Sequence, residues 1–303
     1  NVASTWSNTG FDGDSALTIP GPSNPVFIGD GSSYFHTVTV TTGNALSGSL
    51  SIMEGSVLDV GSTTGNNFGS VAAGSTGTLR ITTTTATALF PAGDFGNFVG
   101  QNGGTVEYYS GAINFTLPLT TDAPTSKAII TYYNLSLVPE TGLSITLPNT
   151  NLVVFGNLSV SGASPTALAR LNSASARTLT IKSNLVVNSG NLLFQNGVAQ
   201  TLRIDGNIII ASGAIFNVAS TGTAVNNQLY IAGNITNNGT FDMCVSSTVK
   251  CDVTFTGYTD ALISGRGATT DFYALTVNKG ASAIPVLNVT SSAFTFSNNS
   301  APL

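Results

Sequence analysis

The chain has 303 residues, of which 42% are hydrophobic and only 8% are charged, with nine Lys or Arg against 14 Asp or Glu and a net charge of −5. The basic residues are scattered, which excludes an electrostatic footprint for nucleic acid or for an anionic membrane surface. No apolar run approaches the roughly 18 residues of a membrane-spanning helix, so the apolar residues are expected to form a protein core and not to insert into a membrane.

The first part of the chain, residues 1–104, alternates strand signals with glycine-rich connections. A polar opening that carries Trp6 and Phe11 leads to a strictly alternating strand signal at 35–41 (FHTVTVT). Two more strand signals follow in SLSIMEGSVLDV and TLRITTTT. We interpret this part as N-terminal β-helix coils with an entry cap, in which Trp6 or Phe11 covers one end of the core. The polar opening favours a processed or truncated segment of a longer polypeptide.

Four segments in the middle of the chain repeat one pattern, an aliphatic alternation followed by a small residue, Asn and a second alternation. They are 152–160 (LVVFGNLSV), 179–187 (LTIKSNLVV), 202–210 (LRIDGNIII) and 229–237 (LYIAGNITN). Their starts are 27, 23 and 27 residues apart, a period that suits one coil of a β-solenoid. The sequence therefore predicts an all-β chain of stacked parallel coils of about 23–27 residues, with about twelve coils in all.

Each coil is expected to turn its aliphatic residues inward and its polar residues outward. In the third repeat Leu202 and Ile204 alternate with Arg203 and Asp205, and a Gly-Asn corner follows, since both residues tolerate a left-handed backbone. Stacking brings the equivalent asparagines to within about 4.8 Å of one another, where their amides can hydrogen-bond along the stack. We predict this structural ladder, with a binding face as the alternative, for Asn157, Asn184, Asn207 and Asn234.

A larger repeat encloses these coils. Residues 105–137 (TVEYYSG, TYYNLSL) and 253–277 (VTFTG, FYALTV) resemble copies of one element, about 140–146 residues apart. We therefore divide the rest of the chain into a β-helix module at 105–252 and the start of a second, truncated module at 253–303. One continuous solenoid is the alternative.

The two cysteines of the chain lie close together, in the polar run MCVSSTVKC. Six intervening residues suit a small disulfide-closed loop between Cys244 and Cys251, of the kind found in oxidising compartments. Two unrelated buried thiols are the alternative. A metal site with these cysteines is not expected, because the one histidine, His36, is far away in the sequence.

Two long stretches resemble repeats of very large secreted surface proteins of Bacteroidota. They are 255–280 (FTGYTDALISGRGATTDFYALTVNKG) and 132–163, which contains YYNLSLVPETGLSITL and LVVFGNLSVSGA. The family phrase is of the type FxGxxxQxIxGxGxTxFYNLTIN, followed by several GNLTI coils. The resemblance implies a right-handed parallel β-helix, an extracellular location at the cell surface, export by the type 9 secretion system, and adhesin roles that include gliding motility.

Candidate chemistry is sparse. Enzymes with a β-helix fold need clustered acids on one outer face, and the acids here are spread over the whole chain. Asp12 and Asp14 begin a weak calcium-loop pattern that lacks the remaining ligands, so no metal site or cofactor is expected. The triplet that starts at Asp14 also matches a short Bacteroidota O-glycosylation pattern, with Ser15 as the acceptor.

Paired tyrosines at strand starts give the one candidate binding surface. One member of each pair should point outward, and we select Tyr108 and Tyr132 as candidate glycan contacts. Edge packing or contacts at a module junction are the alternative. The favoured hypothesis is a non-catalytic structural or adhesive segment whose partners are surface glycans, other cell-surface material and neighbouring modules of its own long chain. The alternative is a carbohydrate-binding or polysaccharide-degrading β-helix of a secreted enzyme, a lyase or hydrolase, with a groove lined by these tyrosines and nearby acids.

Overall fold

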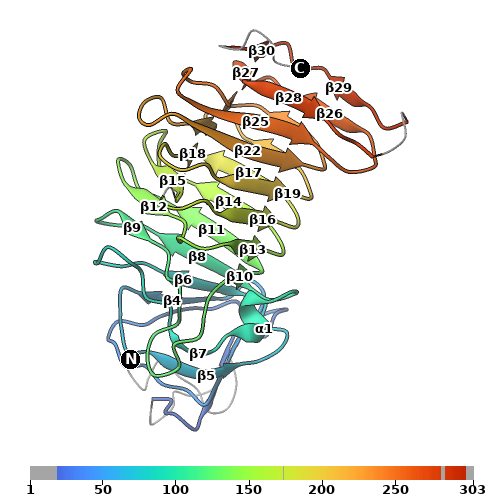
Figure 1. Cartoon of the computed structure of the whole chain (residues 1–303). Coiled ribbons are helices and arrows are strands. Elements are labelled where there is room, and N and C mark those ends of the chain that lie inside the picture. The colour runs from blue at the N-terminus through green and yellow to red at the C-terminus, as the bar shows by residue number, and fades with distance from the viewer. Residues whose placement is uncertain (1–18, 173, 281–283, 298–303) are drawn as a thin grey trace. The chain divides into compact units, whose positions relative to one another are not determined.

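The computed structural model describes residues 19–172, 174–280 and 284–297. Parallel strands stack there as a β-solenoid of about 11 turns, which confirms the predicted all-β solenoid (Figure 1). The described part of the chain has a single short helix, α1 (Gly96–Val99). Within these residues no helix is long and apolar enough to span a membrane.

The chain forms two compact units, residues 1–135 and 136–303. In the first unit, parallel strands follow one another in the orders β1-β3-β5-β7 and β2-β4-β6-β8. The strand bounds in this unit are β1 (Pro25–Ile28), β2 (Thr37–Thr39), β3 (Ser49–Ile52), β4 (Val57–Gly61), β5 (Asn67–Val71), β6 (Thr78–Ile81), β7 (Ala92–Asp94), β8 (Thr105–Tyr109), β9 (Phe115–Thr116) and β10 (Thr131–Tyr132). The boundary between the units falls inside the predicted module 105–252, whose limits stay a prediction from sequence repetition.

Strands of the second unit lie in three parallel sheets, and each coil contributes one strand to each sheet. Sheet 1 contains β13 (Leu152–Val154), β16 (Thr178–Ile181), β19 (Thr201–Ile204), β22 (Val225–Ile231), β25 (Val249–Phe255) and β28 (Ala274–Val277). Sheet 2 contains β11 (Asn134–Val138), β14 (Leu158–Ser161), β17 (Leu185–Ser189), β20 (Ile208–Ile210), β23 (Ile235–Asn237), β26 (Ala261–Ser264) and β29 (Leu287–Val289). Sheet 3 contains β12 (Ser144–Thr146), β15 (Leu168–Leu171), β18 (Asn191–Phe194), β21 (Ile215–Val218), β24 (Thr240–Asp242), β27 (Thr269–Phe272) and β30 (Phe294–Phe296).

The four repeated segments lie in register, as the sequence predicts. The first leucines of the repeats are direct partners across parallel strand pairs and all face the core: Leu152, Leu179, Leu202 and Leu229. Burial of each such side chain stabilises the fold by about 1.5–3 kcal/mol. Because each coil hydrogen-bonds to the coils before and after it, one coil alone lacks both its hydrogen-bond partners and its core.

A row of phenylalanines fills the core beneath sheet 3. The ring centroids of Phe194 and Phe216 are 5.7 Å apart, those of Phe216 and Phe241 also 5.7 Å, and those of Phe241 and Phe272 5.2 Å. All four side chains are fully buried. Such distances are typical of favourable aromatic pairs, so sheet 3 is joined from coil to coil by rings in addition to its backbone hydrogen bonds.

The Gly-Asn corner has a different cause from the one predicted. Neither Gly206 nor Asn207 has a positive φ angle, so a left-handed backbone is not the reason for glycine. A Cβ atom at Gly206 would lie 2.4 Å from the carbonyl oxygen of Ser183 in the preceding coil, and one at Gly233 would lie 2.5 Å from that of Gly206. Close approach of successive coils therefore requires glycine at 206 and 233, whereas Ser183 occupies the equivalent position of the second repeat.

The assignment of residues to the inward and outward faces can be tested by making the same substitution, Ile to Asp, once on each face. Ile204 is 2% exposed, whereas Ile209 on β20 is 38% exposed. Ile204→Asp should lower the free energy of unfolding by more than about 3 kcal/mol, because it buries an unpaired charge. Ile209→Asp should change it by only about 0.5 kcal/mol. Urea unfolding followed by circular dichroism measures both, and equal effects would contradict the assigned faces.

Candidate functional site

The four asparagines of the predicted ladder are hydrogen-bonded from coil to coil. The side-chain oxygen of Asn157 accepts the backbone N–H of Asn184 at 3.0 Å, and that of Asn184 accepts the backbone N–H of Asn207 at 2.9 Å. Asn234 donates to Asn207 in the same way at 2.9 Å, and the oxygen of Asn234 accepts the backbone N–H of Leu262 at 2.8 Å. The asparagine oxygens are thus occupied by backbone donors of the next coil.

A second amide ladder, which sequence reasoning missed, lies at the corner before sheet 1. The backbone N–H of Gln200 donates to the side-chain oxygen of Asn227 at 2.9 Å, and the Gln200 amide donates to the carbonyl of Ser175 at 2.8 Å. The amide of Asn227 continues to the carbonyl of Lys250 at 3.3 Å. Gln200 and Asn227 are both buried, and no shared motif marks them because the ladder uses a different residue type in each coil.

Tyr108 and Tyr132, the candidate glycan contacts, are buried in the core, so this prediction is wrong. Both side chains are 0% exposed, their rings pack edge to face with centroids 6.2 Å apart, and their hydroxyls are hydrogen-bonded at 2.9 Å. The two tyrosines of β8 do face opposite sides of the strand, but Tyr109 points outward and Tyr108 points into the core. Burial raises the pKa of Tyr108 and of Tyr132 above the usual tyrosine value.

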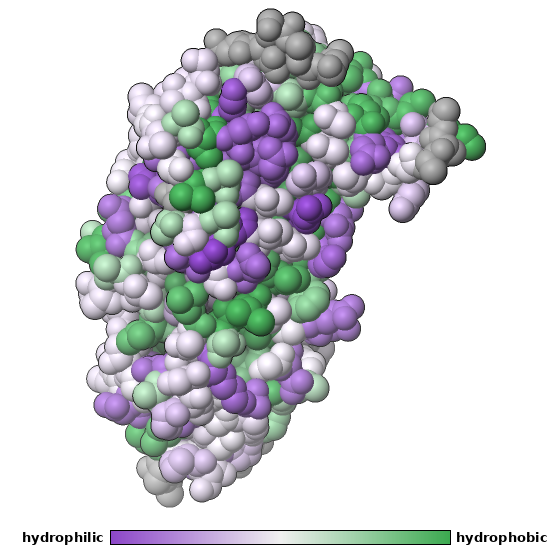
Figure 2. Space-filling model, in the orientation of Figure 1, coloured by the Kyte–Doolittle hydropathy of each residue, from purple (hydrophilic) through white to green (hydrophobic). Residues whose placement is uncertain are grey.

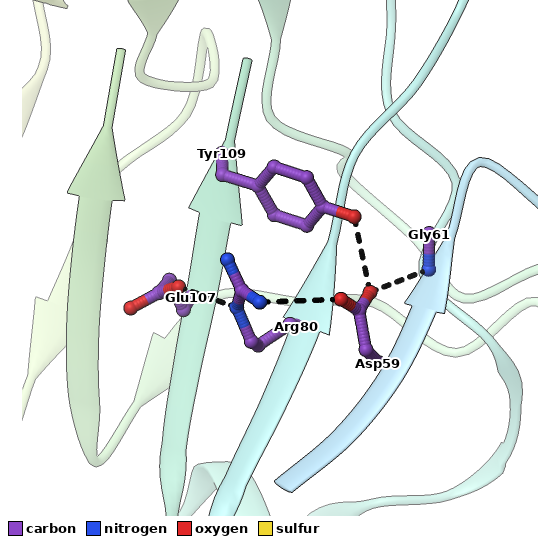
Figure 3. A network of polar contacts seen from close by, with 5 residues as sticks. All are labelled: Asp59, Gly61, Arg80, Glu107 and Tyr109. Carbon is purple, nitrogen blue, oxygen red and sulfur yellow. Dashed lines mark hydrogen bonds and ion pairs between the residues drawn. The ribbon is translucent and has the colours of Figure 1, made fainter. Parts of the chain in front are cut away.

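A charged network lies on the outer face of three successive coils in the first unit (Figure 3). Asp59, Arg80 and Glu107 are register partners on β4, β6 and β8. The guanidinium of Arg80 donates to Asp59 at 3.2 Å and to Glu107 at 2.7 Å. The hydroxyl of Tyr109 and the backbone N–H of Gly61 both donate to the second oxygen of Asp59, at 3.1 and 2.9 Å.

This network ties coils together and does not present a reactive acid. Asp59 accepts three hydrogen bonds and is nearly buried, and Arg80 stacks over the Tyr109 ring at 4.5 Å from its centroid. Partial burial raises the pKa of Tyr109 to about 12, with a further contribution from the charge of Asp59, so this phenol stays protonated at neutral pH. A cation between two carboxylates in one row therefore joins three neighbouring coils electrostatically.

Sheet 1 of the second unit carries a mixed polar and aromatic outer face. Lys182 and Asp205 form an exposed ion pair at 2.9 Å between adjacent coils. The guanidinium of Arg203 lies over the Tyr230 ring at 4.1 Å from its centroid. Figure 2 shows hydrophilic residues gathered over strands of the second unit on the visible face.

The amide–tyrosine patch, defined as Asn226, Gln228, Tyr230, Asp252 and Tyr273, lies further along the same face. The amides of Asn226 and Gln228 both donate to one carboxylate oxygen of Asp252, at 2.7 and 3.2 Å. The other oxygen of Asp252 and the side-chain oxygen of Asn226 are buried and have no hydrogen-bond partner in the structure. Sequence reasoning missed this patch because its members come from β22, β25 and the residue before β28.

Two acids are direct register partners on sheet 3, Asp242 of β24 and Asp271 of β27. Burial raises the pKa of Asp242, and the nearby charge of Asp271 adds to this effect. Asp271 is almost fully buried, and one of its oxygens accepts the hydroxyl of Thr295 at 2.6 Å. The two acids are thus neighbours on adjacent coils, but Asp271 has little contact with solvent.

The structure holds Cys244 and Cys251 as two buried thiols and not as the predicted disulfide. Their sulfur atoms contact different carbonyls, that of Ser246 at 3.5 Å and that of Asp252 at 3.6 Å. Cys251 points into the core from β25, and burial raises the pKa of its thiol well above the usual value. A buried, protonated thiol is a poor partner for disulfide exchange, because the thiolate is the reactive form.

The remaining candidates from the sequence are the weak calcium pattern and the O-glycosylation site near the start of the chain. Asp12, Asp14 and Ser15 lie outside the described residues. In the described ranges, no group of three or more His, Cys, Asp or Glu side chains is placed to hold a metal ion.

Comparison of the chain with protein-family models, with curated proteins and with solved structures gave no match.

The asparagine ladder gives one testable expectation. Asn207→Ala should lower the free energy of unfolding by about 1–2 kcal/mol, because the backbone N–H of Asn234 and the oxygen of Asn184 both lose a partner. Asn188→Ala is the matched control, since the exposed Asn188 makes a single side-chain bond, to Ser161. Its effect should stay within about 0.5 kcal/mol. Equal urea midpoints for the two variants would refute a structural role for the ladder.

The buried tyrosine pair gives a second, pH-dependent expectation. Replacing both residues by Phe should leave stability at pH 7 nearly unchanged, because both polar partners disappear together. Each single variant should be less stable by about 1–3 kcal/mol, because it leaves one buried hydroxyl without its partner.

For an acid with a raised folded pKa, stability is complete below the unfolded pKa of about 10 and is lost as pH rises through the folded pKa. The native chain should therefore become less stable as the pH rises above about 10. The double variant should lose less, with Tyr109 responsible for part of the remainder. Urea midpoints at pH 7, 9 and 11 decide the matter, and an identical alkaline loss in both proteins would contradict this explanation.

Proposed function

We propose that this chain is a non-catalytic structural and adhesive segment of a large extracellular surface protein or fibre. The sequence resemblance to repeats of Bacteroidota surface proteins supports an extracellular location, export by the type 9 route and a role in adhesion, including adhesion during gliding. Surface glycans, other cell-surface material and neighbouring modules of the same long chain are the proposed partners.

One observation carries this proposal: charged and amide side chains on the outside bind mostly to the adjacent coil. Arg80 holds Asp59 and Glu107, Lys182 holds Asp205, and the asparagine ladder connects coil to coil. A stalk or fibre needs cohesion along its stack, since each coil is stabilised only by its neighbours. An active site instead needs accessible acids whose charge is directed at a substrate.

The alternative, a carbohydrate-binding or polysaccharide-degrading β-helix of a secreted enzyme, has one specific observation in its favour. Asp242 and Asp271 are register partners, and the raised pKa of Asp242 is a property of general acids. The near-complete burial of Asp271 favours a structural role for the pair. A lyase or hydrolase with this pair as its active site would need Asp271 to become accessible to a substrate.

An activity screen with a matched pair of variants separates the two functions. The chain should produce no new reducing ends or unsaturated products from neutral or acidic polysaccharides, and Asp242→Asn and Asp205→Asn should behave like the native chain. It should nevertheless bind to whole cells or isolated cell-surface glycans. Measurable turnover that Asp242→Asn abolishes, with Asp205→Asn unaffected, would establish the enzyme and overturn the proposal.

A further inference from the structure

We infer that the amide–tyrosine patch on sheet 1 is a binding site for a neutral, polyhydroxylated ligand, of the chemical class of an uncharged oligosaccharide. This inference rests on the proposed adhesive function and gives it a location and a ligand class. The candidate glycan contacts are then the partly exposed residues of this patch, in place of the buried Tyr108 and Tyr132.

The patch exists because sheet 1 widens at two coils. β22 and β25 each have seven residues, whereas the neighbouring strands β19 and β28 have four. The register places Gln228 beside Asp252 and Asn226 beside Lys250. The longer strands thus add Asn226 and Lys250 to the outer face, next to Gln228 and Asp252.

Beside the added residues, Asp252 has an unbalanced set of hydrogen bonds. One of its oxygens accepts two amide N–H groups, while its second oxygen and the oxygen of Asn226 are buried without a partner. A buried acceptor without a donor costs about 1–3 kcal/mol, and more when it carries charge. A ligand with two hydrogen-bond donors would satisfy both of these acceptors, the second oxygen of Asp252 and the side-chain oxygen of Asn226.

Hydroxyl groups on adjacent ring carbons of a sugar supply such donors. The carboxylate of Asp252 and the side-chain oxygen of Asn226 can each accept an O–H group, and neither can donate to an anionic one. The neighbouring cations, Arg203 and Lys250, lie over tyrosine rings. An uncharged sugar therefore fits the patch better than an acidic polysaccharide. A metal ion fits less well, because the patch contains only one carboxylate and hard cations prefer several charged oxygens.

Tyrosine rings flank the acceptors and complete the site. Tyr230 lies two residues after Gln228 on the outer face of β22, and the guanidinium of Arg203 stacks over its ring. The ring of Tyr273 is held by Lys250, whose ammonium lies 4.0 Å from the ring centroid and 2.7 Å from the hydroxyl. Rings with an apolar body and a polar edge suit the mixed faces of a sugar. Asn226, Gln228, Tyr230, Asp252 and Tyr273 are all partly exposed. Because the two acceptor oxygens are buried, binding requires the side chains of the patch to rotate.

Binding to defined probes tests the inference. Immobilised neutral oligosaccharides (glucan, mannan, xylan and galactan fragments) are compared with acidic ones (alginate and polygalacturonate fragments), followed by titration calorimetry of the best binder. The native chain should prefer one or more neutral probes. Asp252→Asn keeps the shape but removes the charge, and it should weaken binding at least tenfold.

Asp205→Asn is the matched control, because it neutralises an exposed carboxylate on the same sheet, and its affinity should stay within twofold of the native value. Circular dichroism and urea midpoints confirm that each variant is folded, and Tyr273→Ala supplies a second loss of binding should Asp252→Asn unfold. Affinity that disappears with a chelator would show a cation site and overturn the inference. The same applies if no neutral probe binds, or if Asp252→Asn binds as the native chain does.

The two proposals fail separately. Adhesion to cells that persists in Asp252→Asn, with no neutral probe bound, removes this site and leaves the adhesive function in place. Turnover of a polysaccharide removes the proposed non-catalytic function whatever the patch binds.

Discussion

Parallel, in-register stacking of coils is the constraint on which the rest of this structure depends. Every strand hydrogen-bonds to the equivalent strand of the next coil, about 4.8 Å away. A side chain therefore always has the equivalent residue of the adjacent coil as its neighbour. Equivalent residues of successive coils therefore form a row. The row stabilises the fold only when each side chain packs or hydrogen-bonds well with the next one.

Different rows meet this constraint with different chemistry. Inward rows repeat aliphatic residues or phenylalanines, which gain from contact with their own kind. Corner rows use amides, since an amide accepts from one neighbour and donates to the other. Charges of alternating sign attract along a row, as those of Asp59, Arg80 and Glu107 do. Where two acids are neighbours, as Asp242 and Asp271 are, the pKa of Asp242 is raised.

The same logic explains where a binding function can arise. In the asparagine ladder and in the Asp59–Arg80–Glu107 network, polar groups of successive coils bind one another. Sheet 1 departs from regularity at β22 and β25, and there the acceptors of Asn226 and Asp252 have no partner within the protein. On the adhesive function proposed above, binding would therefore be located at these two coils.

The sequence by itself determined the coil, its period and its inward face, because aliphatic alternation and a recurrent Gly-Asn corner are local signals that repeat. It also indicated Asn157, Asn184, Asn207 and Asn234 as one row, since equivalent positions in coils must stack. Only the tertiary structure decided which tyrosine of a pair is buried, what the two cysteines do, and which outward residues meet. Those outcomes depend on register and burial between coils 21–27 residues apart, such as Asp59 with Arg80 and Arg80 with Glu107. A single chain sequence carries no local signal for such contacts between unlike residues.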